Sequence, residues 1–184
     1  MTESLRGKLL VAAPSLADPN FYRTVVLMLE HTDEGAAGVV LNRPSETDVR
    51  DPLAQWADVA AEPAVVFVGG PVQPSGVICL ARAVPNAAPE GYVELADRIG
   101  TLDLERDAAL AVPDLEVLRV FAGYTGWGSG QLEGEMAEEA WLVLEALPGD
   151  VFTPDPRHLW REVFRRQSGS LRLLANFPPH PSLN

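Results

Sequence analysis

The sequence is poor in the residues that most catalytic and metal centres need. Among its 184 residues there are one cysteine, one lysine and three histidines. The single cysteine, Cys79, excludes an internal disulfide and a cysteine-based zinc site. The only lysine, Lys8, lies far along the chain from every glycine-rich segment, which excludes a phosphate-binding P-loop. These absences predict a protein without a bound cofactor or metal.

Long apolar runs are also missing, and so is an excess of positive charge. No stretch is long enough to span a bilayer and the first ten residues do not resemble a secretory signal, so we expect a soluble cytoplasmic protein with no membrane partner. The net charge of −12 repels nucleic acid and anionic lipid. Residues 156–172 form a basic stretch of five arginines against one glutamate, and the remaining chain carries −16. We interpret this stretch as a solvated helix face and expect no tight contact with duplex DNA.

What is present is an ordinary globular balance, with 47% hydrophobic and 22% charged residues, which predicts one domain over residues 1–184. Apolar runs bounded by glycine, proline and acidic residues predict strands at 7–14, a hairpin over 25–44, and further strands at 64–72, 75–83, 90–101, 115–126 and 141–146. Helices are expected at 47–60, 103–111, 130–141 and 154–168, the last with Asp155 as its N-cap. Clustered strands with irregularly placed helices predict an α+β fold.

The hairpin carries the first candidate site residues. Its two apolar runs are separated by residues 33–35, so the hairpin brings Glu30 or His31 within reach of Asn42 and Arg43 across the turn. Strand alternation sends Glu30 and His31 to opposite faces, so these two are not automatically partners. A contact between Glu30 and Arg43 is more often a surface salt bridge than a functional site.

The segment at 121–135, FAGYTGWGSGQLEGE, looks at first like a nucleotide-binding turn between a strand and a helix. Its spacing does not fit. A dinucleotide fingerprint needs a third glycine where Glu133 stands, and a nucleophile elbow around Ser129 needs glycines where Trp127 and Gln131 stand. Glutamates in the first turn of the following helix also repel a phosphate. We interpret the segment as a sharp turn in which glycines supply unusual backbone angles and Trp127 covers the turn.

Three motifs lie in a fixed order along the chain. They consist of Glu30, His31, Gly35, Ala36, Gly38, Asn42 and Pro44; of Gly69, Gly70 and Pro71; and of Gly123, Tyr124, Trp127, Gly130, Gln131, Leu132, Glu133 and Glu135. Together they closely resemble the YqgE/AlgH family of small bacterial proteins, with Thr32 standing where asparagine is frequent. The resemblance implies an α+β fold in which a mixed, strongly bent sheet forms a partial barrel flanked by helices. It implies no settled activity, although members are often labelled transcriptional regulators.

Two classes of function follow from these residues. In the first, the chain is a non-enzymatic binding or regulatory module with an unidentified protein partner, and a small-molecule ligand stays open. Its binding residues are then Glu30, His31, Asn42, Arg43, Gly69, Gly70, Tyr124, Trp127 and Gln131. In the second, the chain is a small hydrolase or transferase with His31 as general base, oriented by Glu30, which requires a concave pocket around His31. A metal site built from Glu30, His31 and Asp33 has ligand types but no established spacing, and we expect none.

Overall fold

Ten strands form one curled sheet in the computed structural model, which describes residues 3–180. In chain order the strands are β1 Leu9–Ala12, β2 Val25–Thr32, β3 Gly35–Val40, β4 Pro44–Asp48, β5 Val65–Val68, β6 Val72–Ala83, β7 Tyr92–Ala96, β8 Ile99–Leu102, β9 Leu115–Gly128 and β10 Trp141–Leu144. Their spatial order is β10-β1-β2-β3-β9-β6-β8-β7, with β5 pairing to both β4 and β9. The β5–β9 pair is parallel and the other pairs are antiparallel, so the sheet is mixed.

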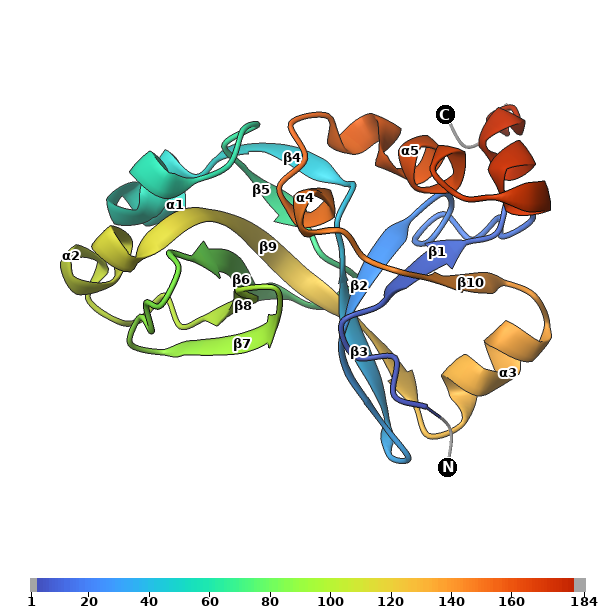
Figure 1. The fold of residues 1–184 in the computed structure, drawn as a ribbon, viewed down its shortest axis with the longest axis horizontal. Coiled ribbons are helices and arrows are strands. Elements are labelled where there is room, and N and C mark those ends of the chain that lie inside the picture. Colours follow the sequence, from blue (N-terminus) through green and yellow to red (C-terminus); the bar gives the residue numbers. More distant parts are fainter. Residues whose placement is uncertain (1–2, 181–184) are drawn as a thin grey trace.

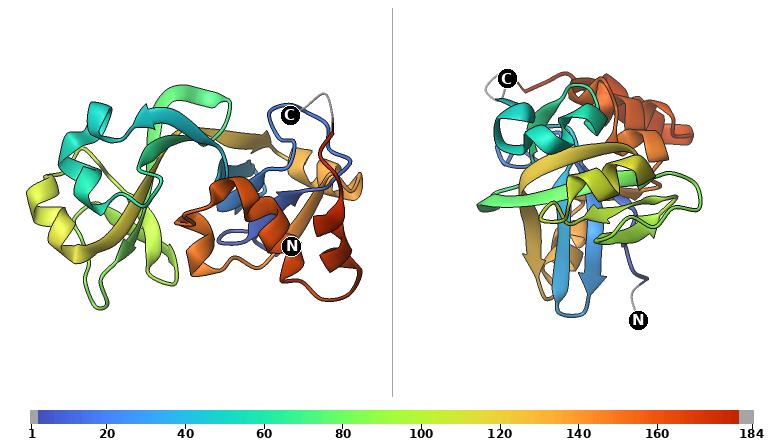
Figure 2. Two further views of the ribbon diagram at one scale, coloured as in Figure 1. Left: turned by 90° about the horizontal axis from the view of Figure 1, so that it is seen from above. Right: turned by 90° about the vertical axis from the view of Figure 1, so that its left-hand side faces the viewer.

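The long strand β9 connects the two halves of the sheet. Its first part pairs with β6, and its last four residues pair with β3. Gly123 lies two residues before the pairing with β3 begins and has φ of 71°, a left-handed conformation that glycine adopts without steric cost. The sheet curls into a half-barrel with helices around it, as Figures 1 and 2 show, and the α+β fold with a strongly bent mixed sheet is confirmed.

Short helices cover the sheet over three apolar clusters. The helices are α1 Arg50–Leu53, α2 Ala108–Ala111, α3 Gln131–Ala137, α4 Pro148–Val151 and α5 Leu159–Arg165, and the 3₁₀ helices are η1 Ala54–Val59, η2 Val112–Asp114, η3 Pro156–His158 and η4 Gly169–Asn176. The central core joins the sheet to α5 through Phe121 and Phe164. A second core surrounds Trp56 next to α2, and a third packs α3 onto β1–β3 through Trp127 and Trp141. Within residues 3–180 no helix is long and apolar enough to cross a bilayer.

Two helix predictions were wrong in part. The helix expected at 47–60 is divided between the end of β4, the single turn α1 and the 3₁₀ helix η1, because Leu53 adopts φ −141° and ψ 49° and ends the α-helical turn. Asp155 occupies the expected N-cap position, but its side chain makes no capping hydrogen bond. Its carboxylate contacts Nδ1 of His158 at 2.8 Å instead, and the segment begins as a 3₁₀ helix.

Candidate functional site

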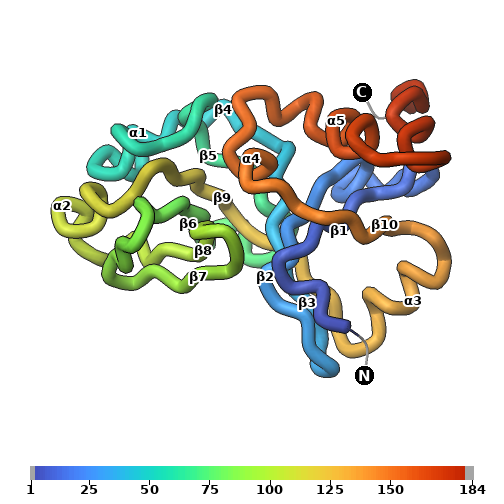
Figure 3. The backbone as a smooth tube through the Cα atoms, in the orientation of Figure 1, coloured from blue at the N-terminus to red at the C-terminus, as the bar shows by residue number. Residues whose placement is uncertain are grey.

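The end of the sheet projects as a three-stranded arm, which we define as residues 29–32, 35–38 and 125–128 (Figures 1 and 3). Residues opposite each other on antiparallel strands share a face. Glu30 pairs with Ala37, and Ala37 pairs with Gly126, so these three form one row. We call their side the inner face, because alternation along β3 places it on the same side as Val39 of the central core. The other side is the outer face.

The inner face of the arm is hollowed into a groove of about 380 Å³. The residues around it are Glu30, Thr32, Glu34, Gly35, Ala36, Ala37, Val72, Tyr124, Gly126 and Trp127. Small residues from β3 and β9 form its floor, while Glu30 and Glu34 stand on one side and Tyr124 on the other. A floor of glycine and alanine lets a ligand approach the strands closely.

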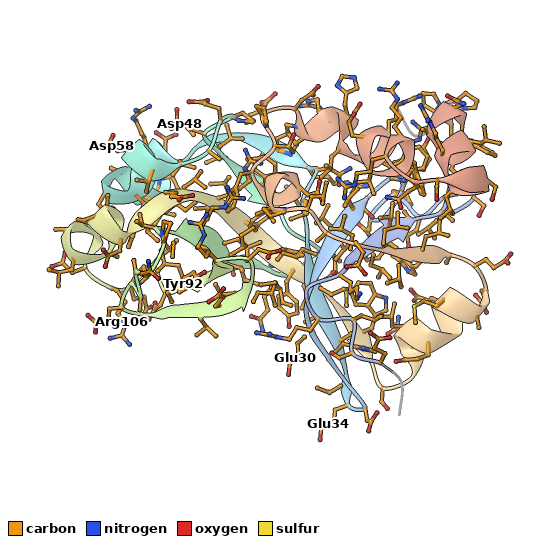
Figure 4. All side chains as sticks on the ribbon, viewed as in Figure 1. Glu30, Glu34, Asp48, Asp58, Tyr92 and Arg106 are labelled. Carbon is orange, nitrogen blue, oxygen red and sulfur yellow. The ribbon has the colours of Figure 1, made fainter. Side chains whose placement is uncertain are left out.

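Three polar groups around this groove have no partner within residues 3–180. The carboxylates of Glu30 and Glu34 are exposed and make neither a hydrogen bond nor an ion pair there. The hydroxyl of Tyr124 is likewise without a hydrogen bond in that part of the chain, although the residue packs against the central core. Figure 4 shows Glu30 and Glu34 projecting from the hairpin on the side away from α3. The groove is therefore anionic and rich in acceptors.

His31 lies on the outer face and is occupied at both ring nitrogens. Its Nδ1 accepts a hydrogen bond from the backbone N–H of Leu5 at 3.1 Å, so this nitrogen carries no proton. Its Nε2 then donates to the Glu133 carboxylate at 2.8 Å, and only 5% of the side chain is exposed. The hydrogen bond from His31 lowers the pKa of Glu133. His31 thus fastens both the N-terminal segment and α3 to the arm.

A second carboxylate of α3 holds two tryptophans. Oε2 of Glu135 accepts hydrogen bonds from the indole N–H of Trp127 at 2.9 Å and of Trp141 at 2.8 Å. Its Oε1 accepts from the amide of Gln131 at 3.0 Å, and Gln131 in turn accepts from the backbone N–H of Gly128. The two indoles pack edge to face with centroids 5.9 Å apart. The glutamates of the glycine-rich segment are therefore used inside the fold.

We expect Glu135→Ala to lower the free energy of unfolding by about 2 kcal/mol, because two nearly buried indole N–H groups lose their acceptor. Urea unfolding followed by tryptophan fluorescence measures the effect. Glu138→Ala is the matched control on the exposed end of the same helix, with an expected change within about 0.5 kcal/mol. Equal unfolding midpoints for the two variants would contradict this role of Glu135.

The remaining hairpin residues do not join the groove, which corrects the expected contact across the turn. The turn has two residues, and Thr32 pairs with Gly35, so Glu30 faces Ala37 and not Arg43. Asn42 lies at the far end of the hairpin, where its side chain bonds the backbone of Val25 and Arg23.

Arg43 and Gly70 lie beside a different and smaller hollow. Arg43 donates to the backbone oxygen of Tyr22 at 3.1 Å, and burial lowers the pKa of Arg43. With Gly70 it lines a pocket of about 70 Å³. Gly69 and Gly70 cross β9 in close backbone contact, since a Cβ on Gly69 would lie 2.3 Å from the oxygen of Gly123. The expected binding residues therefore occupy at least three separate places.

The basic stretch is only partly a solvated face. Arg157 and Arg165 are exposed, as expected. Arg161 instead donates to the backbone oxygen of Ala175 at 2.9 Å, and Arg166 forms a two-bond ion pair with Asp150 at 2.6 and 2.7 Å. Arg161 and Arg166 therefore make contacts within the fold, whereas the whole stretch was expected to be a solvated helix face.

Two further kinds of site were sought in the described part of the chain: a cluster of metal ligands and a reactive thiol. Residues 3–180 contain no group of three or more His, Cys, Asp or Glu side chains arranged to hold a metal ion. Cys79 is buried on β6, and burial strongly raises the pKa of its thiol, which keeps the sulfur protonated and unreactive.

Comparison with known proteins places the chain in a family. A family model described as AlgH-like matches residues 9–172. The chain belongs to the AlgH-like family. A UPF0301 protein of Streptomyces coelicolor is 54% identical to this AlgH-like chain over 191 residues, covering 100% of the chain and 98% of that relative. A UPF0301 protein of Thermobifida fusca is 47% identical over 190 residues, covering 98% and 96%.

Two solved structures share the AlgH-like fold described above. The crystal structure of a protein from Corynebacterium diphtheriae is 31% identical with a TM-score of 0.89, covering 96% of this chain and 94% of that one. The solution structure of the AlgH protein from Pseudomonas aeruginosa is also 31% identical, with a TM-score of 0.71 and coverage of 98% and 97%. The names of these relatives state no activity, so the function of the AlgH-like chain is argued from its own site.

Several groove residues were missed by the sequence predictions. Thr32 could have been predicted, because strand alternation places it on the same face as Glu30. Ala37 could have been predicted from a two-residue turn, which places it opposite Glu30 on that face. Val72 gave no such signal, because it reaches the groove only through its pairing with Tyr124 on β9.

Proposed function

We propose that the AlgH-like chain, taken as one unit over residues 1–184, is a non-enzymatic binding or regulatory module that contacts its partner through the groove. The observation that carries the proposal is the set of three polar groups, Glu30, Glu34 and Tyr124, that have no partner within residues 3–180 and surround a floor of small residues. The carboxylates of α3, Glu133 and Glu135, by contrast accept hydrogen bonds from His31, Trp127 and Trp141. Groups that the fold leaves unused are available to a partner.

The geometry of His31 gives little support to the alternative of a hydrolase or transferase. A general base needs a free lone pair within reach of the substrate proton. In His31 the lone pair of Nδ1 accepts from Leu5 and Nε2 is held by Glu133. The side chain also lies on the face opposite the groove, so Glu30 cannot orient it from there.

Direct reading of DNA is also poorly supported, because the groove is acidic and both Arg161 and Arg166 are bound within the fold. A regulatory role, if the family label is followed, then acts through a protein. We place the module in the cytoplasm, in keeping with a single buried thiol, Cys79.

The proposal is tested by filling the groove. We expect Ala37→Trp to reduce capture of the protein partners by about tenfold or more, since the indole occupies the floor between Glu30 and Tyr124. Quantitative affinity capture from a lysate of the organism that encodes the chain gives the measurement. Val93→Trp adds the same side chain to an exposed position on β7 and serves as the matched control.

Both variants are first compared with the wild type by circular dichroism and thermal unfolding. Partners that are retained equally by folded Ala37→Trp and Val93→Trp proteins would remove the groove as the contact surface.

A further inference from the structure

The groove has a chemical bias that narrows the kind of partner it can accept. Among the described residues that line it, the two charged side chains, Glu30 and Glu34, are both acidic, and none is an arginine, lysine or histidine. Both carboxylates are left without a counter-charge in the described part of the chain. A ligand that supplies positive charge and several hydrogen-bond donors complements this surface, whereas an anion is repelled.

We infer that the groove binds an arginine side chain carried by an exposed segment of a partner protein. This inference rests on the proposed function and adds the chemistry of the contact. Arginine presents five donors in a planar fork, which matches carboxylate acceptors, and its flat face stacks on aromatic rings. Glu30 and Glu34 supply the acceptors. On the other side of the groove Tyr124 supplies the ring and a hydroxyl that makes no hydrogen bond to residues 3–180. A lysine ammonium satisfies the charge but not the stacking.

The shape of the groove favours a side chain on a larger partner over a free small molecule. Sites for small ligands are concave and bury most of the ligand surface. Here Glu30, Thr32, Glu34 and Gly126 are all exposed, so the groove covers only part of any occupant. A protein segment adds contacts along the rest of the arm and excludes water from the charged pair.

The test uses short blocked peptides as probes of the groove. We titrate the ¹⁵N-labelled full chain with a pentapeptide that carries arginine between glycines, and with the same peptide carrying citrulline, the neutral isostere, or lysine. We expect amide shifts at residues 30–37 and 124–126 with the arginine peptide, and about fivefold weaker binding of the citrulline peptide. The lysine peptide should fall between the two.

Glutamine variants test whether the carboxylates that attract the arginine peptide are those of the groove. Glu30→Gln and Glu34→Gln should each weaken the arginine peptide about threefold and leave the citrulline peptide unchanged. Glu105→Gln removes an exposed carboxylate beside α2 and is the matched control, with no expected change.

Four results would overturn the inference. The first is equal binding of the arginine and citrulline peptides at the groove, and the second is an equal loss of binding in Glu105→Gln. The third is a set of amide shifts that spreads over the acidic surface outside the arm. The fourth is binding of free arginine amide, titrated as a small-molecule probe, as tight as binding of the arginine pentapeptide. These failures are separate from failure of the proposed function. If Ala37→Trp still loses the captured partners, the groove remains the contact surface and only its ligand chemistry is wrong.

Discussion

Gly70→Ala is expected to prevent stable folding, with a loss of about 4 kcal/mol or more in the free energy of unfolding. A Cβ at this position would lie 2.2 Å from the carbonyl carbon and oxygen of Tyr124, and 2.5 Å from the backbone nitrogen of Thr125. All three atoms belong to the backbone of β9, so rotation of a side chain cannot relieve the clash. Gly70 also has φ of 155°, which a residue with a Cβ rarely adopts.

Gly134→Ala provides the matched control for this substitution. Gly134 lies within α3, and a Cβ there meets no atom within 4 Å. We expect this change to raise stability by about 0.5 to 1 kcal/mol, because alanine has the better helix propensity and restricts the unfolded chain. Urea unfolding monitored by circular dichroism compares the two. A folded Gly70→Ala protein with a wild-type midpoint would contradict the close crossing of residues 69–70 with β9.

The second large effect is expected at Arg166. Its guanidinium forms two hydrogen bonds to the carboxylate of Asp150, whose side chain is only 6% exposed, and donates also to the backbone oxygen of Glu145. Arg166→Ala leaves the Asp150 charge buried without its partner. We expect a loss of about 3 kcal/mol, at the lower end for broken buried pairs because the Arg166 side chain is itself 26% exposed.

The neighbouring arginine makes a close control. Arg165 pairs with Glu162 at 2.7 Å, but both side chains are more than half exposed. Arg165→Ala should therefore change stability by at most about 0.5 kcal/mol. Thermal and urea unfolding of both variants, at the same pH and salt, gives the comparison. Equal losses would show that burial of Asp150 does not decide the strength of its pair.

The local sequence predicted the parts of this structure that depend on neighbours in the chain. Alternation placed Glu30 and His31 on opposite faces, and the structure has them so. The argument against a phosphate loop used only the charge of the acidic first turn of α3. Glu133 does more than repel anions, since it is bonded to His31, which lies 102 residues away.

Contacts between distant segments could not be predicted in this way. The interpretation of residues 156–172 as a solvated helix face holds for Arg157 and Arg165, yet Arg161 donates a hydrogen bond to Ala175 in η4. The sequence shows that residues 69 and 70 are glycines. It does not show that the backbone of β9 crosses beside them and leaves no room for a Cβ. Predicting such contacts requires the three-dimensional path of the whole chain.

Trp127 belongs to both faces of the arm. The residue lines the groove, and its indole is hydrogen-bonded to Glu135 and packed against Trp141 on the outer face. Only one layer of backbone separates a partner in the groove from this pair of indoles. Tryptophan emission depends on the polarity and hydrogen bonding around the ring, so the molecule carries a built-in optical reporter. Binding of a partner in the groove on the inner face can therefore be followed, without any attached dye, from the fluorescence of Trp127 on the outer face.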